Sequence, residues 1–191
     1  MKTSTKVWIG VGIVVLLLVF GIIGMYNNFV TMQQDVNSKW SEVENQYQRQ
    51  ADLIPNLVSV VSSAVSAETS YVKDVVAART KWQAAASNLE KDTAGVEMNN
   101  GISALVNAVA ENYPVLKANT QYVALTDELS GTQNRITVAR GRYIESVQTM
   151  NTAVKRFPAN ILAGIFGFEQ VEYYTAEAGT ATPSLGTGEL P

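Results

Sequence analysis

The chain contains neither cysteine nor histidine among its 191 residues. Without cysteine it has no disulfide, no thiolate metal site and no cysteine nucleophile. Without histidine it lacks the commonest general base, the commonest metal ligand and the Glu-x-x-His pairs of di-metal bundles. The sequence also has no G-x-S-x-G motif and no P-loop. We therefore expect no catalytic residue, no bound metal and no cofactor, and hence no enzyme.

Charge is also scarce, since charged residues make up 16% of the chain and the net charge is −3. This gives no basic footprint for nucleic acid, so no nucleic-acid partner is expected. Part of the scarcity comes from residues 7–25, a run from Val7 to Met25 without a charged side chain. As a helix this run is about 28 Å long, close to a hydrocarbon core of about 30 Å. No A-x-A-like cleavage site follows, so we expect an uncleaved transmembrane helix in contact with the lipid bilayer.

The orientation of this span follows from the basic residues beside it. Lys2 and Lys6 precede the span, whereas the first basic residue after it is Lys39, which lies among acidic residues. Because basic residues stay in the cytoplasm, we expect residues 1–6 to be cytoplasmic and the rest of the chain to be periplasmic or extracellular.

Apolar residues then recur at seven-residue spacing, as they do on one face of a long helix. The first series lies between Met25 and about Asn88 and comprises Trp40, Tyr47, Ile54, Val61 and Val75. The second lies between about Asn119 and Phe157 and comprises Tyr122, Leu129, Ile136, Tyr143, Met150 and Phe157. A companion series on the second helix is small or lightly polar, which favours close approach of another helix; it includes Thr132, Ala139 and Ser146.

A third helix is expected around Met98 to Val109. We predict a turn before it at Lys91–Glu97, which is polar and contains Gly95, and a non-helical connector after it at Asn112–Asn119. The fold class is then all-α: over residues 26–157, an antiparallel helical bundle of three long helices and a shorter one. Its first helix continues the transmembrane helix, with only a weak break near Ser66–Thr69.

Side chains of the bundle are expected to have ordinary structural roles. We place Tyr47, Tyr71, Tyr122 and Tyr143 in the core, although a ligand cavity between helices is an alternative for them. Arg135, Arg140 and Arg142 are expected to form ion pairs within the bundle, with anion binding as the alternative.

The segment DLIPNL (Asp52 to Leu57) places a proline inside the first long helix. Pro55 has no N–H and leaves the carbonyl of Ala51 without its usual donor. Because the heptad series stays in phase across it, we predict a continuous helix that bends at Pro55. We also predict that Asp52 and Asn56 satisfy the loosened backbone groups.

Residues 158–176 are apolar and aromatic, and we expect a short helix followed by an extended stretch, with a flexible tail at 177–191. This segment either closes the bundle or forms a contact with a protein or the membrane surface. The candidate contact residues are Ile161, Ile165, Phe166, Phe168, Tyr173 and Tyr174.

Several segments together resemble the LemA family of bacterial membrane proteins. They are YNNFV at Tyr26, DLIPNL, YPVLKAN at Tyr113, Ala139-Arg140 and FPANILAGIFGF at Phe157. The chain departs from the family pattern at two places. The family usually has a basic run before DLIPNL, where this chain has YQRQ. The family also usually has a His-Glu pair where this chain has Ala67-Glu68. The resemblance implies a helical bundle tethered by one span and no established enzymatic activity. Its structural-motif residues here are Asp52, Pro55, Asn56, Tyr113, Pro114, Lys117, Asn119, Arg140 and Pro158.

From these observations we expect a membrane-anchored structural or adaptor protein. Its bundle would contact other proteins, copies of the same chain included, in a role such as membrane organisation. The alternative is an envelope ligand-binding or sensor module with a cavity between its helices.

Overall fold

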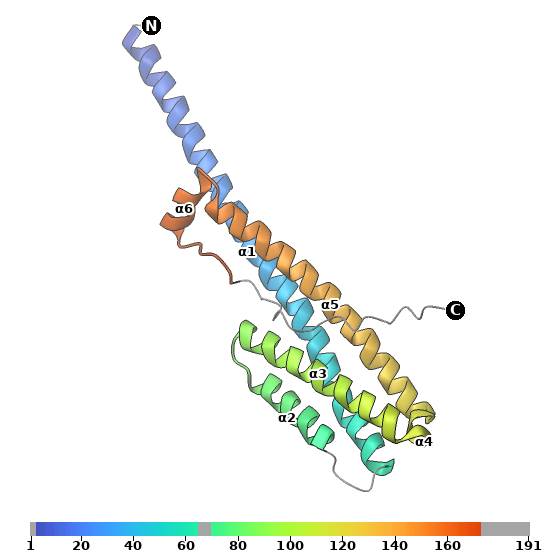
Figure 1. Ribbon diagram of the computed structural model, residues 1–191. Helices are drawn as coiled ribbons and strands as arrows, with labels where there is room; N and C mark the ends of the chain where they lie inside the picture. Colours follow the sequence, from blue (N-terminus) through green and yellow to red (C-terminus); the bar gives the residue numbers. More distant parts are fainter. Residues whose placement is uncertain (1–2, 65–69, 173–191) are drawn as a thin grey trace, which may run out of the picture.

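The computed structural model describes residues 3–64 and 70–172, and the regular structure in these ranges is helical throughout (Figure 1). The helices are α1 (Thr3–Ala64), α2 (Ser70–Ala84), α3 (Asn88–Asn112), α4 (Pro114–Lys117), α5 (Thr120–Lys155) and α6 (Ala159–Phe166). The predicted all-α bundle, with its first helix continuous with the apolar N-terminal segment, is confirmed. The predicted break at Ser66–Thr69, the tail at 177–191, Tyr173 and Tyr174 lie outside the described residues.

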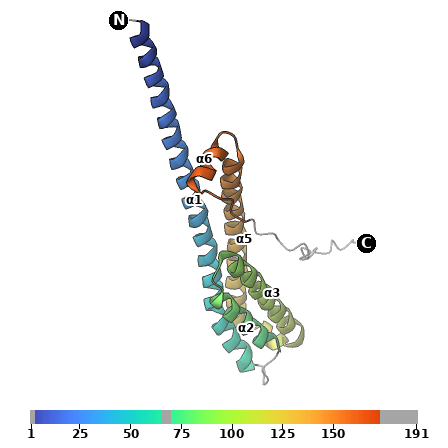
Figure 2. The same cartoon turned by 90° about the vertical axis from the view of Figure 1, so that its left-hand side faces the viewer.

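The helix α1 has 62 residues, and its N-terminal part projects beyond the other helices (Figures 1 and 2). Large apolar side chains are exposed along this part, from Trp8 through Leu17 to Phe20. In the described part of the chain, α1 is the one helix long and apolar enough to cross a membrane. Such a surface is stable in lipid and costly in water.

The two longest helices, α1 and α5, run antiparallel and side by side (Figures 1 and 2). The rings of Trp40 and Tyr143 meet edge to face with centroids 5.5 Å apart. The heptad residues of both helices are buried, apart from Phe157, which lies beyond the end of α5 and is exposed. The small residues Thr132, Ala139 and Ser146 are buried too. The predicted small-residue series is therefore part of the interior of the bundle.

Between Met25 and Asn88 the sequence predicts a helical stretch with only a weak break, and the structure has two separate helices there. The helix α2 begins at Ser70, runs back along α1 and pairs with α3 (Figure 1). The side chain of Tyr71 is exposed on α2 rather than in the core. The apolar face of α1 already packs against α5 and α3, so the seven-residue spacing does not require the same helix to continue beyond Ala64.

The predicted turn at Lys91–Glu97 is also wrong, because these residues lie within α3. The chain turns earlier, at residues 85–87. Ser87 caps α3, since its hydroxyl accepts from the N–H of Glu90 at 3.2 Å while the Glu90 carboxylate accepts from the N–H of Ser87 at 3.1 Å. Backbone hydrogen bonds to its carboxylate lower the pKa of Glu90.

Gly95 has a packing role rather than a turn role. A Cβ atom at this position would lie 2.5 Å from the Tyr47 ring, closer than any side chain tolerates. The missing side chain therefore lets the ring of Tyr47, which is fully buried, lie directly against the backbone of α3.

Pro55 lies inside α1, so the predicted continuity of the helix is confirmed, while the bend stays a prediction. The donor to the Ala51 carbonyl is neither Asp52 nor Asn56, and that part of the prediction is wrong. Arg79 of α2 donates its Nε–H to this carbonyl at 2.8 Å. Asp52 instead accepts from the side chain of Gln48 at 2.8 Å. The Ala51 carbonyl, left without a helical donor by Pro55, thus joins α1 to α2 through its hydrogen bond from Arg79.

The connector between α3 and α5 contains one helical turn, α4, where a non-helical connector was predicted. Pro114 is at its first position, where the absent N–H costs nothing. Asn119 then caps α5, its side-chain oxygen accepting from the N–H groups of Gln121 and Tyr122.

The link between Arg79 and Pro55 predicts a specific coupling. Arg79→Met should lower the free energy of unfolding by about 1–3 kcal/mol, because the buried Ala51 carbonyl loses its donor. In a Pro55→Ala background the same change should cost less than about 1 kcal/mol, since the N–H of the new alanine supplies the donor. Urea titration of the full chain in detergent, followed by tryptophan fluorescence, measures both costs.

The matched control is Lys81→Met on the same helix, which removes an exposed ion pair to Glu97 at 2.6 Å. Its cost should be below about 1 kcal/mol in both backgrounds. Equal costs of Arg79→Met with and without Pro55 would contradict the assignment.

Candidate functional site

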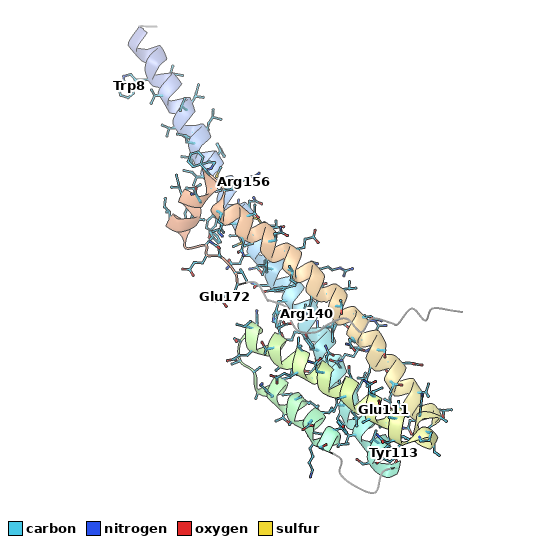
Figure 3. All side chains as sticks on the ribbon, viewed as in Figure 1. Trp8, Glu111, Tyr113, Arg140, Arg156 and Glu172 are labelled. Carbon is cyan, nitrogen blue, oxygen red and sulfur yellow. The ribbon has the colours of Figure 1, made fainter. Side chains whose placement is uncertain are left out.

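A buried carboxylate joins three helices at the centre of the bundle. Asp92 of α3 is 5% exposed. It accepts from the Tyr47 hydroxyl of α1 at 3.3 Å and from the Arg140 guanidinium of α5 at 2.8 Å. We call Tyr47, Asp92 and Arg140 the polar triad. Figure 3 shows Arg140 at mid-length of α5, on the part of the molecule where α1, α3 and α5 come together.

Burial governs the electrostatics of the polar triad. Desolvation raises the pKa of Asp92, and the nearby Arg140 charge and the Tyr47 hydroxyl only partly oppose this effect. Desolvation also raises the pKa of Tyr47 above its ordinary value, with the Asp92 charge adding to the effect. At neutral pH the phenol of Tyr47 therefore keeps its proton and is a hydrogen-bond donor to Asp92.

Further polar contacts surround the polar triad. Lys91 pairs with Glu44 across the α1–α3 contact and lies 5.7 Å from the centre of the Trp82 ring. Gln50, which is 1% exposed, donates to the side chain of Asn99. Gln50 thus interrupts the apolar series because it faces a polar partner on α3. These contacts fix how the α2–α3 hairpin docks, which is a structural role.

The three arginines that lie close together in the sequence, Arg135, Arg140 and Arg142, have different surroundings in the structure. Arg140 belongs to the polar triad. Arg142 lies 3.7 Å from Glu42, at an exposed position. Arg135 lines an open hollow of about 440 Å³ between α1 and α5. Gln46 also lines this hollow, and its side-chain Oε1 atom is buried without a hydrogen-bond partner.

A second group of side chains lies where the bundle meets the apolar part of α1. Tyr26 of α1 contacts Phe166 and Phe168, with ring centroids 5.0 and 5.7 Å away, and Phe29 stacks on Phe168 at 5.0 Å. Gly167, at φ 75°, ends α6 in the left-handed conformation and turns the chain back so that Phe168 reaches α1. We call Tyr26, Phe29, Phe166 and Phe168 the aromatic cluster.

Beyond the aromatic cluster the chain is held to α5. The side chain of Asn151 both accepts from the N–H and donates to the carbonyl of Val171, each at 2.8 Å. Phe168 and Val171 therefore close the membrane-proximal end of the bundle, whereas Ile161 and Ile165 are exposed.

Within the described residues, no group of three or more acidic side chains could hold a metal ion. A profile of the LemA family matches residues 39–185. The chain belongs to the LemA family.

Its relatives include two proteins of Paramagnetospirillum magneticum, magnetosome protein MamQ 1 and magnetosome protein MamQ 2. Each is 27% identical over 186 residues, which cover 84% of this chain and 68% of the relative. The magnetosome protein MamQ of Magnetospirillum gryphiswaldense is 26% identical over 185 residues, with the same coverage. The LemA match begins inside α1, after the apolar segment, and so comprises the bundle and α6.

The structure gives most of the LemA motif residues separate local roles. Pro55 releases the carbonyl bound by Arg79, Pro114 begins α4, and Asn119 caps α5. Tyr113 is half-buried and caps the C-terminal end of α3. Two others, Asp52 and Lys117, are exposed.

The remaining motif residues are Asn56, which is exposed on α1, Pro158, which is the residue before α6, and Arg140 of the polar triad. Sequence reasoning missed Asp92 and Arg79 as partners. Asp92 is in a stretch whose polarity looked like a turn, and Arg79 has no local motif. The Ser87-x-x-Glu90 capping box was the available signal that α3 starts before Lys91.

The burial of the polar triad predicts unequal roles for two neighbouring arginines of α5. Arg140→Ala should lower the free energy of unfolding by about 3 kcal/mol at neutral pH, because it leaves the buried Asp92 charge unpaired. The control Arg142→Ala removes an exposed contact and should cost less than about 1 kcal/mol. Chemical denaturation in detergent measures both values.

The pH dependence checks the cause. Because the folded-state pKa of Asp92 lies above its unfolded value near 4, the carboxyl favours folding at low pH, and this contribution is lost as pH rises through the folded pKa. Without Arg140 that pKa rises further, so the cost of Arg140→Ala should shrink from pH 8 to pH 5. A cost independent of pH, or one no larger than that of Arg142→Ala, would contradict the role of the triad.

Proposed function

We propose that this LemA-family protein is a membrane-anchored, non-enzymatic structural or adaptor protein. Its bundle is held at a fixed height above the bilayer for contacts with other proteins, including copies of the same chain. The observation that carries the proposal is the continuity of α1, which joins the apolar segment to the bundle core without a linker. A helix of this kind transmits position and orientation, which a flexible tether does not.

The interior of the bundle supports a structural role. The buried carboxylate of Asp92 joins helices, since it binds Arg140 of α5 and Tyr47 of α1. The relatives are named as magnetosome proteins, which denotes a place in a cell rather than a reaction. The support for a role at a membrane comes from the apolar part of α1.

Anchoring also favours self-association. Chains inserted in one membrane share a single orientation, and confinement to two dimensions raises their effective concentration. Three apolar side chains of α5 are exposed and offer contacts for a second copy: Val123, Ile144 and Val138, which also lines the hollow between α1 and α5. The basic residues Lys2 and Lys6 support an N-terminus in the cytoplasm and a bundle on the opposite side of the membrane.

The hollow between α1 and α5 favours a second candidate, a ligand-binding or sensor module. The hollow has a volume of about 440 Å³ and is lined by Arg135, Arg142 and Gln46. A thermal-shift screen of small anions, peptides and lipids would support this candidate only if stabilisation disappears in an Arg135→Gln variant.

The main proposal predicts assembly in the membrane. The full chain, solubilised in a mild detergent, should have a mass by light scattering of at least two copies. Val138→Glu should shift it towards one copy, because a charge then lies in an apolar contact. A control change on α2, Val76→Glu, should leave the mass unchanged. A strict monomer that co-purifies with no other protein would count decisively against the proposal.

A further inference from the structure

The outer face of α6 is apolar and uncovered. Ile161 is 55% exposed, Ile165 69% and Phe166 42%, and Phe157, just before the helix, is 77% exposed. Four large apolar side chains within ten residues make a patch of the kind that marks an interaction surface. In the described part of the chain Tyr26 covers one side of Phe166, whereas Phe157, Ile161 and Ile165 remain largely exposed.

The position of α6 along α1 indicates what covers this apolar face. Trp8 and Tyr26 are at the two ends of the apolar segment, about 27 Å apart on a helix, and aromatic residues at such spacing mark the two membrane interfaces. The ring of Tyr26 contacts Phe166 at 5.0 Å and Phe168 at 5.7 Å. The helix α6 therefore lies at the depth of the membrane interface, and both views show it beside α1 at the base of the projecting segment (Figures 1 and 2).

Charge near α6 is arranged as a bilayer surface requires. The end of α5 has two basic residues, Lys155 and Arg156, directly before Phe157. Figure 3 shows Arg156 at the membrane-proximal end of α5 and Glu172 farther from the projecting segment. Arg156 also borders a hollow of about 550 Å³ lined by Met25 and Asn28 of α1. Lys155 and Arg156 thus lie at the level of lipid phosphates, and Glu172 lies on the bundle side. A second acidic residue, Glu169, directly follows Phe168 and is exposed.

We propose that α6 and Phe157 form a second membrane contact, an interfacial element whose occupant is the lipid bilayer itself. Phe157, Ile161 and Ile165 enter the boundary between headgroups and acyl chains of the leaflet where α1 leaves the membrane, and Lys155 and Arg156 meet lipid phosphates. Continuity with the α1 span through Tyr26 selects lipid over a protein partner. One helix alone leaves the bundle free to rotate about its axis, and a second contact fixes which side faces the membrane.

The absence of cysteine makes the test clean, since each introduced cysteine is unique. Full chains carrying Ile161→Cys or Ile165→Cys are labelled with nitrobenzoxadiazole in vesicles of phosphatidylcholine with a minority of phosphatidylglycerol. Val14→Cys, in the α1 span, is the control for lipid, and Val115→Cys, 87% exposed on α4, is the control for water. Quenching is measured with nitroxide-labelled lipid and with iodide present on both sides of the membrane.

The labels at 161 and 165 should be quenched by nitroxide lipid several-fold more than the label at 115, and by iodide several-fold less. Iodide quenching equal to that at 115 would overturn the proposal, since α6 would then face water. Shielding from both quenchers would overturn it as well, because a protein surface, such as a second copy, would then cover the face. Self-association of the chain is measured separately, so either proposal can fail alone.

Discussion

The structure depends on α1 remaining one helix across Pro55. A proline in a helix interior removes a donor and costs about 3 kcal/mol when nothing compensates. Here the released Ala51 carbonyl, in a fully buried residue, accepts from Arg79 of α2. The same group that would weaken α1 thus becomes the attachment point for the α2–α3 hairpin, so continuity of the helix and docking of the hairpin depend on each other.

Two further devices fix that docking. Gly95 lets the backbone of α3 touch the Tyr47 ring, and the hydroxyl of the same tyrosine reaches Asp92, which Arg140 holds from α5. Apolar packing alone would permit several rotations of the hairpin against α1, because helix ridges fit grooves in more than one way. A buried carboxylate with two partners is satisfied in only one of them.

Much of this architecture could be read from the sequence, because the heptad series reports burial on one face of a helix directly. Trp40, Tyr47, Ile54 and Val61 are all buried as expected. The errors arose where one residue type serves two purposes. Gly95 signals a turn in isolation but permits close helix contact here, and the heptad register extends past Ala64 although the chain reverses. The pairings Arg79–Ala51 and Arg140–Asp92 bring together residues 28 and 48 positions apart, and no local pattern encodes them.

The candidate site was less predictable than the fold. The apolar and aromatic residues of the C-terminal segment stood out by composition. Which of them pack on α1, as Phe168 does, and which are exposed, as Ile165 is, depends on the reversal at Gly167. Together these features describe one long helix, α1, whose apolar N-terminal part is long enough to cross a membrane. The helix α6 packs beside α1 at the base of that part, and the other helices of the bundle pack along its C-terminal part.

The rigidity of that long helix is the central claim, and a distance across it tests the claim most directly. Spin labels at Asn27→Cys and Ser62→Cys, both exposed on α1, flank Pro55 and the whole bundle portion of the helix. Double electron–electron resonance on the full chain in bilayers should give one narrow distribution of the distance between the two labels, centred at about 52 Å. This is the rise of a continuous helix over that interval. A broad distribution, or a main distance well below it, would show that α1 is interrupted and would contradict the claim.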